Sequence, residues 1–238
     1  MKVSAFLPIR QSRTMLDKIR MDGFKEAMRH ACHRIAEHYG DWRLGIQTGR
    51  YVSKQELGYA DTSSNVEYVA TSYHALGSCF DRIPIRLGQS VCVDYGCGMG
   101  RVVIFAALRG FRKVIGVEYS AQLAEVARQN VRRAVKRLRC PVEIVNADAQ
   151  SYPVPDDADV IFMFNPFRGR VLANVINNIH ASIRAHPRKI WMIFVTSGEF
   201  ERLTQGENWI EKTYEHFFYP RIRHAIYCCH EGISEGGD

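Results

Sequence analysis

Short apolar runs alternate with longer helical patterns from residue 90 almost to the end of the chain. The runs at 91–93, 114–117, 142–145, 160–164 and 190–195 predict buried strands. The stretches at 102–108, 121–138 and 171–183 show the spacing of helices that pack on a sheet. A series of strand, helix and strand folds into a mostly parallel sheet covered by helices. The sequence therefore predicts an α/β domain.

Two further strands are expected between residues 208 and 228, with a turn near Pro220. No helical pattern separates them, which favours an antiparallel hairpin at one edge of the sheet. The run at 160–164 contains no polar residue. We therefore expect this strand to lie in the centre of the sheet and to be buried on both faces.

The first part of the chain has a different pattern. Apolar residues recur at spacings of three to five between residues 11 and 39, which predicts a helix that stops near Gly40. Residues 41–66 are rich in glycine and polar residues and are expected to form a loop with a short strand, and a helix is expected over 72–80. We divide the chain into an N-terminal helical extension, residues 1–66, that covers the substrate side, and an α/β domain, residues 67–238.

Composition indicates the cellular compartment and the kinds of partner that we expect for this chain. It has 238 residues, a formal net charge of +7 and seven cysteines without a CxxC pair, so we expect free thiols, a reducing compartment and no metal site. No apolar run approaches the ~20 residues that span a bilayer, and the N-terminal apolar stretch is too short for a secretory signal. We expect a cytoplasmic protein with no membrane partner. Its positive charge permits contact with nucleic acid but does not require it.

The strand at 91–93 runs into Asp94 and then into the glycine-rich turn Gly96-Cys97-Gly98-Met99-Gly100. Glycine lets the backbone turn sharply and lets a ligand lie against it. In a parallel sheet this edge is where nucleotides bind. The dinucleotide fingerprint needs a glycine where Arg101 stands, and the Asp94 carboxylate would repel a pyrophosphate. S-adenosylmethionine has an ammonium, a sulfonium and no phosphate, so it suits this turn better.

Two more carboxylates follow the next two strands. Glu118 stands at the end of the second strand, where a carboxylate can accept hydrogen bonds from both ribose hydroxyls. Asp148 follows the third strand and can accept from the adenine amino group, while the amide of Ala149 meets the ring. Three acids at successive strand ends, with the glycine turn, indicate a nucleoside site rather than scattered surface charges.

These residues resemble the cofactor-binding half of class I, Rossmann-like S-adenosylmethionine-dependent methyltransferases. The stretch 94–100 is similar to that family's first motif, Glu118 to its ribose-binding position and Asp148 to its adenine-binding position. The resemblance implies a seven-stranded sheet with an antiparallel last strand and S-adenosyl-L-methionine as methyl donor. It also implies cofactor contacts at Asp94, Gly96, Gly98, Gly100, Glu118, Asp148, Ala149 and Asn165.

A fourth motif, Phe164-Asn165-Pro166-Phe167, follows the central strand. It resembles the N-P-P-F or N-P-P-Y motif of amino-group methyltransferases but has one proline fewer. In that family the asparagine and a proline carbonyl accept hydrogen bonds from the target nitrogen, and the aromatic ring packs on the substrate. The resemblance implies that Asn165, Pro166 and Phe167 are catalytic and that the acceptor is a nitrogen of a protein lysine or a small amine. A strand-to-helix turn with a structural role is the alternative.

Residues 67–73 precede the sheet at the distance where related methyltransferases place a segment with Tyr and Thr against the methionine end of the donor. By this resemblance, Tyr68 and Thr71 contact the donor carboxylate or close over the site. Packing of the Tyr68 ring in the protein core is the other interpretation.

Three other functions stay open from the sequence. An O-methyltransferase acting on a sugar or secondary metabolite would need a general base, and no His or Asp stands beside Asn165. An NAD-dependent oxidoreductase would need the missing fingerprint glycine. A non-catalytic RNA-binding module would use the basic residues of the N-terminal helix and of the stretch 128–139.

Overall fold

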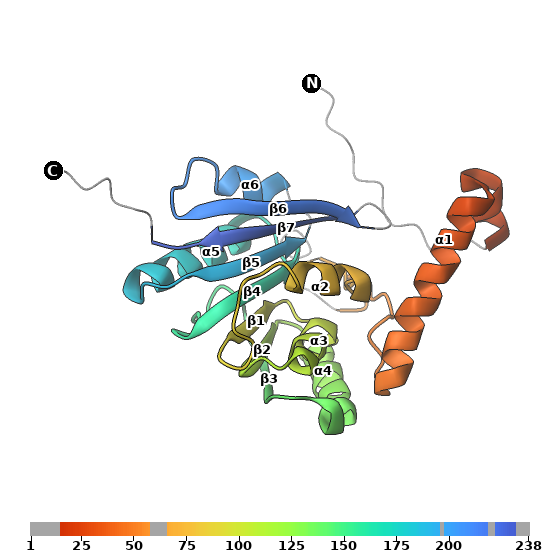
Figure 1. Ribbon diagram of the computed structural model, residues 1–238, viewed down its shortest axis with the longest axis horizontal. Helices are drawn as coiled ribbons and strands as arrows, with labels where there is room; N and C mark the ends of the chain where they lie inside the picture. The colour runs from red at the N-terminus through yellow and green to blue at the C-terminus, as the bar shows by residue number, and fades with distance from the viewer. Residues whose placement is uncertain (1–14, 58–65, 196–197, 219–221, 232–238) are drawn as a thin grey trace.

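The structure, a computed structural model, describes residues 15–57, 66–195, 198–218 and 222–231. Its strands are β1 (Val91–Tyr95), β2 (Lys113–Glu118), β3 (Val142–Asn146), β4 (Ala158–Phe164), β5 (Ile190–Val195), β6 (Ile210–Phe218) and β7 (Ile222–Cys229). They form one sheet of seven strands in the order β3-β2-β1-β4-β5-β7-β6 (Figure 1). The predicted α/β fold is confirmed.

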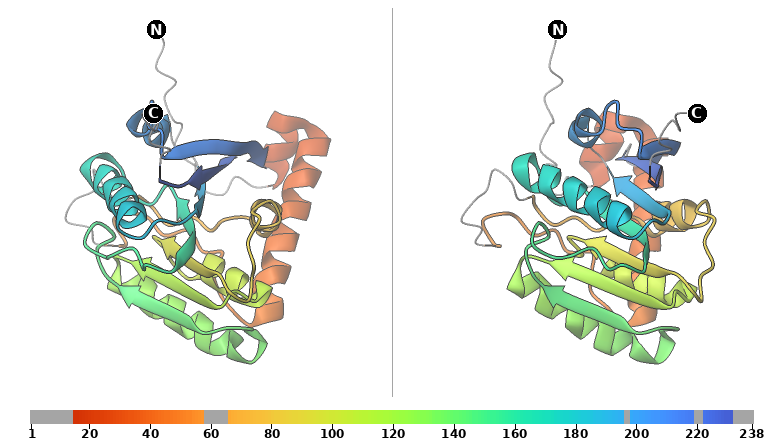
Figure 2. Two further views of the ribbon diagram at one scale, coloured as in Figure 1. Left: turned by 60° about the vertical axis from the view of Figure 1, so that its left-hand side comes forward. Right: turned by 90° about the vertical axis from the view of Figure 1, so that its left-hand side faces the viewer.

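The helices are α1 (Met15–Leu44), α2 (Tyr73–Phe80), α3 (Arg101–Arg109), α4 (Ala121–Ala134), α5 (Gly169–Ala185) and α6 (Gly198–Leu203). Figure 2 shows α3 and α4 on one face of the sheet and α5 on the other, while α1 stands at one side of the domain. The helix expected over 72–80 is confirmed. The short helix α6 was not predicted, because six residues with one buried apolar side chain, Phe200, show no periodicity.

Strands β1 to β5 pair in parallel, whereas β7 runs antiparallel to both β5 and β6. The reversed last strand and the hairpin are therefore as predicted, and the turn expected near Pro220 lies outside the described residues. Strand β4 lies between β1 and β5, and its residues from Val160 to Met163 are buried. Burial on both faces explains why residues 160–164 of this strand include no polar residue, whereas Asp159, near its start, is only partly buried.

The core has two layers, one on each face of the sheet. Helix α5 presents a stripe of buried residues at helical spacing to one face, namely Leu172, Val175, Ile176, Ile179 and Ile183. Helices α2 and α3 bury their apolar residues on the opposite face. Each fully buried aliphatic side chain of this kind contributes about 1.5–3 kcal/mol of transfer free energy. These two layers support the parallel strands, whose carboxyl ends line the pocket described below.

Helix α1 continues to Leu44, so the predicted stop at Gly40 was wrong. Residue 40 is a glycine because the ring of Tyr73 lies where a Cβ would be, so this glycine serves a close approach rather than the end of a helix. The extra turn carries Asp41 inward. Leu44 and Ile46 then pack in the same core layer as α2 and α3. The helix start expected at residue 11 lies outside the described residues, and the domain boundary at residue 66 stays a prediction.

Within the described ranges, no helix is both long and apolar enough to cross a bilayer.

His224 of β7 is a buried histidine, with 2% of its surface exposed. Its Nδ1 lies 3.1 Å from the carbonyl oxygen of Ile222, and its Nε2 has no partner among the described residues. Burial lowers the pKa of His224 to about 4, and the neighbouring His216 adds to this, while the Ile222 carbonyl opposes it. The folded protein therefore holds this imidazole neutral at pH values where an exposed histidine is charged.

We expect His224 to reduce the stability of the protein as the pH falls from about 6.5 toward 4, because the unfolded chain gains a proton there and the folded chain does not. Between pH 7 and pH 5 the loss from this residue is about 2 kcal/mol. Urea unfolding at both pH values should show a smaller difference for His224→Gln than for the wild type. The exposed His38 of α1 gives the control variant His38→Gln, and an unchanged difference in His224→Gln would contradict the assignment.

Candidate functional site

A pocket of about 200 Å³ opens at the carboxyl end of the parallel strands. Its wall combines the glycine turn after β1, the ends of β2 and β4, the loop after β3 and residues 66–71. Open α/β sheets bind their ligands in the crevice outside this edge. The pocket is therefore the candidate site.

The pocket brings together almost all of the residues that the sequence indicated. Those lining it are Tyr68, Thr71, Asp94, Gly96, Gly98, Glu118, Asp148, Ala149, Asn165, Pro166 and Phe167. Gly100 does not line it; this residue precedes α3 with a φ of 86° and faces Ala127 of α4. The binding and catalytic roles of these residues stay predictions, and their convergence on one pocket supports them.

Asp94 lies in β1 as a buried floor residue, 2% exposed, rather than at an open mouth as the sequence pattern indicated. Burial raises the pKa of this carboxyl well above its usual range, and the negative charge of Glu118 adds to the effect. Its Oδ2 has no hydrogen-bond partner among the described residues. A buried, unpaired carboxyl oxygen is costly, and an ammonium group placed against it would satisfy it. The floor of the pocket thus fits a cationic ligand.

Glu118 stands at the end of β2 and is 5% exposed. One carboxylate oxygen accepts from the amide of Gly98 at 2.8 Å, and the other accepts from the amide of Ser120 at 2.9 Å. Burial raises the pKa of Glu118, while these backbone hydrogen bonds act in the opposite direction. Each oxygen keeps a further acceptor position. Glu118 can therefore brace the glycine turn and accept from two vicinal hydroxyls at once.

Asp148 follows β3 and is oriented by its neighbour. Its Oδ1 accepts from the backbone amide of Gln150 at 3.0 Å, and its Oδ2 accepts from the Gln150 side chain at 2.8 Å. The amide oxygen of Gln150 in turn accepts from Asn174 of α5 at 2.9 Å. This chain of bonds holds the carboxylate beside the buried Ala149 at the wall of the pocket.

Two segments pack directly on the glycine turn, where Gly96 has a φ of 79° and Gly98 a φ of 55°. A Cβ on Gly96 would overlap Pro166, and a Cβ on Gly98 would overlap the ring of Tyr68. Glycine is required at both positions by conformation and by contact. Within the described residues, Asn165 is the sole non-glycine with positive φ, at 39°. A left-handed conformation is tolerated by asparagine better than by most residues, and it turns the chain sharply after β4.

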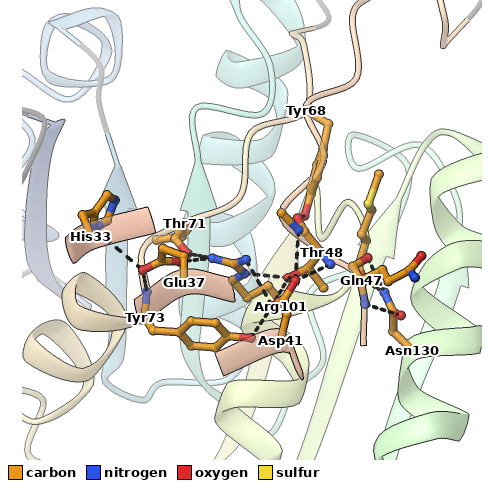
Figure 3. Close-up of polar contacts among 12 residues, drawn as sticks. His33, Glu37, Asp41, Gln47, Thr48, Tyr68, Thr71, Tyr73, Arg101 and Asn130 are labelled. Atoms are coloured by element: carbon orange, nitrogen blue, oxygen red, sulfur yellow. Dashed lines mark hydrogen bonds and ion pairs between the residues drawn. The ribbon is translucent and has the colours of Figure 1, made fainter. Parts of the chain in front are cut away.

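The sequence reasoning missed a buried polar cluster, shown in Figure 3, that begins in the pocket wall at Arg101 and Thr71 and extends away from it. Its centre is Arg101, the first residue of α3, which contacts Glu37 and Asp41 of α1, the side chain of Thr48 and the carbonyl of Thr71. The partners lie 30 to 64 residues away along the chain. No local spacing joins such positions, so a single sequence contains no signal for this cluster.

Many of the residues that line the pocket lie in a stretch that is similar to a known protein family. Residues 92–186 match a family described as methyltransferase domain. Ribosomal protein L11 methyltransferases of Burkholderia cenocepacia and Burkholderia lata are 47% identical to the chain over 49 residues. That match covers 21% of this chain and 16% of each relative.

Solved structures share the fold at low sequence identity. An RNA methyltransferase from Salinibacter ruber, in complex with S-adenosyl-L-homocysteine, aligns with a TM-score of 0.52 and 18% identity over 71% of this chain and 99% of that one. The putative methyltransferase yhhF from Escherichia coli aligns with a TM-score of 0.52 and 16% identity over 68% and 89%. At these identities the likeness shows a common fold.

We expect Glu118→Gln to weaken the binding of S-adenosylhomocysteine about tenfold, because a charged acceptor contributes roughly 1.5–3 kcal/mol and a neutral amide only part of it. Isothermal titration calorimetry measures the dissociation constant. Glu143→Gln is the matched control, since Glu143 lies on the neighbouring strand β3, is exposed and pairs with Lys113 at 2.7 Å. Affinity within twofold of the wild type in Glu118→Gln would contradict the assignment of this carboxylate to the ribose.

Proposed function

We propose that this chain, whose residues 92–186 match a methyltransferase domain, is a class I S-adenosylmethionine-dependent methyltransferase that transfers a methyl group to an amine nitrogen. S-adenosylmethionine supplies, when bound, a methyl carbon activated by its sulfonium. The observation that carries the nitrogen assignment is the position of Asn165 and Pro166 at the wall of the donor pocket, with Pro166 packed on Gly96. In this proposal the side-chain oxygen of Asn165 and the carbonyl oxygen of Pro166 accept hydrogen bonds from the incoming nucleophile.

The charges of the pocket support this donor. Asp94 offers an unpaired carboxyl oxygen to an ammonium, Glu118 offers two acceptor positions to a ribose, and Asp148 stands ready for an amino group. Because a pyrophosphate would bring further negative charge to this floor, the site disfavours a dinucleotide. The family assignment and the chemistry of the residues thus agree on a positively charged nucleoside.

The side chains around Asn165 favour nitrogen over oxygen as the acceptor. A neutral amine attacks through its lone pair: the nitrogen–carbon bond forms, the carbon–sulfur bond breaks with its electrons going to sulfur, and the ammonium product releases its proton to water. A hydroxyl would need a general base. No histidine lines the described pocket; of its four carboxylates we assign Asp94, Glu118 and Asp148 to the donor, which leaves Glu67 as the one carboxylate that an oxygen acceptor would have to use as its base. The amide oxygen of Asn165 and the carbonyl of Pro166 suffice to orient an amine.

A protein amine is the first acceptor to test. The matched Burkholderia relatives are named for a ribosomal protein substrate, although the match spans 16% of their length. A structural relative is named as an RNA methyltransferase, so RNA with exocyclic amino groups belongs in the same panel as lysine peptides, small amines and hydroxylated metabolites. Transfer of labelled methyl groups to this panel, with the product bond identified by mass spectrometry, tests the proposal. Label found on oxygen alone would overturn it.

We expect the variant Asn165→Gly to lower kcat about 10- to 100-fold, the loss that one or two transition-state hydrogen bonds cause. Glycine is chosen because it adopts the observed φ of 39° without strain, so the substitution removes only the side chain. Binding of S-adenosylhomocysteine should stay within about threefold of the wild type. A variant that binds the product normally and turns over at the wild-type rate would show that Asn165 does not orient the acceptor.

A further inference from the structure

Arg101 follows the glycine turn directly and is 3% exposed. Its Nε donates to Thr48 Oγ1 at 2.6 Å, Nη1 donates to the Thr71 carbonyl at 3.0 Å and also contacts Glu37, and Nη2 donates to Asp41 Oδ1 at 3.1 Å. The guanidinium therefore uses all three of its nitrogens on protein partners. Figure 3 shows it in the middle of these side chains, with Glu37 and Asp41 reaching it from α1.

The ring of Tyr73 covers this cluster, with the Arg101 guanidinium carbon 4.4 Å from the ring centroid. The Tyr73 hydroxyl donates to Asp41 Oδ1 at 2.7 Å, and the Tyr73 amide donates to Glu37 Oε1 at 3.0 Å. Both acids are therefore held from two sides. The cluster ties the last turns of α1 to the first turn of α2 and to the glycine turn in a single unit.

Asp41 also shapes the chain after α1. Its Oδ2 accepts from the amides of Thr48 at 2.6 Å and Gly49 at 3.1 Å, and the Thr48 hydroxyl lies 2.8 Å from its Oδ1. These bonds fix the Thr48 carbonyl, which accepts from the Tyr68 hydroxyl at 2.8 Å. The Tyr68 ring is the one that lies against Gly98 at the donor pocket. A continuous set of contacts thus runs from Arg101 through Thr48 to Tyr68.

Apolar packing and one further polar clamp also hold these segments, since Val52 and Tyr68 pack with Met99 of the glycine turn. In residues 45–57 and 66–71, the regular backbone pairing is a single bridge between Val52 and Tyr68. A second clamp comes from Asn130 of α4, which bonds the backbone of Gln47 at 3.0 and 3.1 Å and the Met99 carbonyl at 2.9 Å. Both clamps join the loop to the glycine turn, and the Arg101 cluster is the one that also reaches Thr71.

Stability alone does not account for such a cluster. It buries two carboxylates against one guanidinium, and buried ion pairs of this kind are often no more stabilising than apolar residues of the same volume. Their value here is directional, because a guanidinium holds several acceptors in one plane. Of the acceptors that it holds, Thr71 lines the donor pocket, and Thr48 bonds Tyr68, which also lines it.

We propose that Arg101 is a positioning residue of the methyl-donor site, acting through Thr48, Thr71 and Tyr68 rather than by touching the reacting atoms. It makes the last turns of α1 and the following loop part of the donor site. Residues 37–48 then serve donor binding, in addition to any contact that the N-terminal segment makes with the acceptor. This inference concerns the donor and does not depend on which atom receives the methyl group.

The test compares two arginine clamps at opposite ends of the sheet. Arg101→Lys keeps the charge but cannot reach Thr48, Thr71 and both acids at once. Arg188→Lys is the matched control, because Arg188 likewise donates to backbone carbonyls, those of Ala158 and Pro155 at 3.0 Å, at the amino end of β4. The full-length proteins are measured for folding by circular dichroism, for Tm, and for the dissociation constant of S-adenosylhomocysteine by calorimetry at 25 °C.

We expect Arg101→Lys to be folded at 25 °C and to bind S-adenosylhomocysteine at least tenfold more weakly, whereas Arg188→Lys lowers Tm and leaves the dissociation constant within twofold. In turnover assays Arg101→Lys should raise KM for the donor and keep kcat near the wild-type value at saturating donor. Wild-type affinity in Arg101→Lys, or equal weakening in both variants, would overturn the proposal. An inactive amine panel would overturn the acceptor assignment alone, because this readout needs no acceptor.

The milder variant Thr48→Val keeps the proposal testable if Arg101→Lys does not fold. It removes the hydroxyl that bonds both Arg101 and Asp41 and leaves the guanidinium and both acids in place. We expect about three- to tenfold weaker binding of S-adenosylhomocysteine from the loss of one such bond. Binding equal to that of the wild type would show that the contacts through Thr48 do not position the donor site.

Discussion

The glycine turn after β1 is the constraint on which the site depends, because its backbone is approached from three sides at once. The Glu118 carboxylate bonds the Gly98 amide from the end of β2, Pro166 packs on Gly96 from the end of β4, and Tyr68 packs on Gly98 from the N-terminal side. The contacts of Pro166 and Tyr68 leave no room for a side chain at Gly96 or at Gly98. These contacts with the glycine turn therefore fix the positions of the ends of β2 and β4 and of Tyr68 around the pocket.

The buried carboxyl groups of the pocket favour a positively charged ligand over a phosphate-bearing one. Asp94 and Glu118 are both buried at neighbouring strand ends, and burial raises the pKa of each. A positively charged ligand compensates the buried carboxyls, whereas a phosphate would add to their mutual repulsion. The same sheet edge that holds dinucleotides in other α/β proteins is thus adapted here to a sulfonium nucleoside by the placement of acids, while the fold itself is shared.

The N-terminal part of the chain contributes to the donor site through packing as well as polar contacts. Leu44 and Ile46 join the core beside α2 and α3, and the acids of α1 surround Arg101. Residues 66–71 reach the pocket wall because this scaffold holds them there. This pocket cannot be understood from the part of the chain that carries the familiar motifs alone, since the acids of α1 contact Arg101 in its wall.

The sequence by itself determined the strands, the main helices, the antiparallel hairpin and the acids at the strand ends. These features depend on short stretches of sequence: apolar runs, helical spacing and a glycine turn. The parallel topology then brings Asp94, Glu118 and Asn165 together at the carboxyl ends of the strands. Only the tertiary structure showed that Gly40 makes room for the ring of Tyr73 and does not end α1. It alone decided the partners of Arg101, which lie 30 to 64 residues away along the chain. Contacts between residues so far apart in the chain depend on how the helices and strands pack. A local sequence pattern does not contain this information.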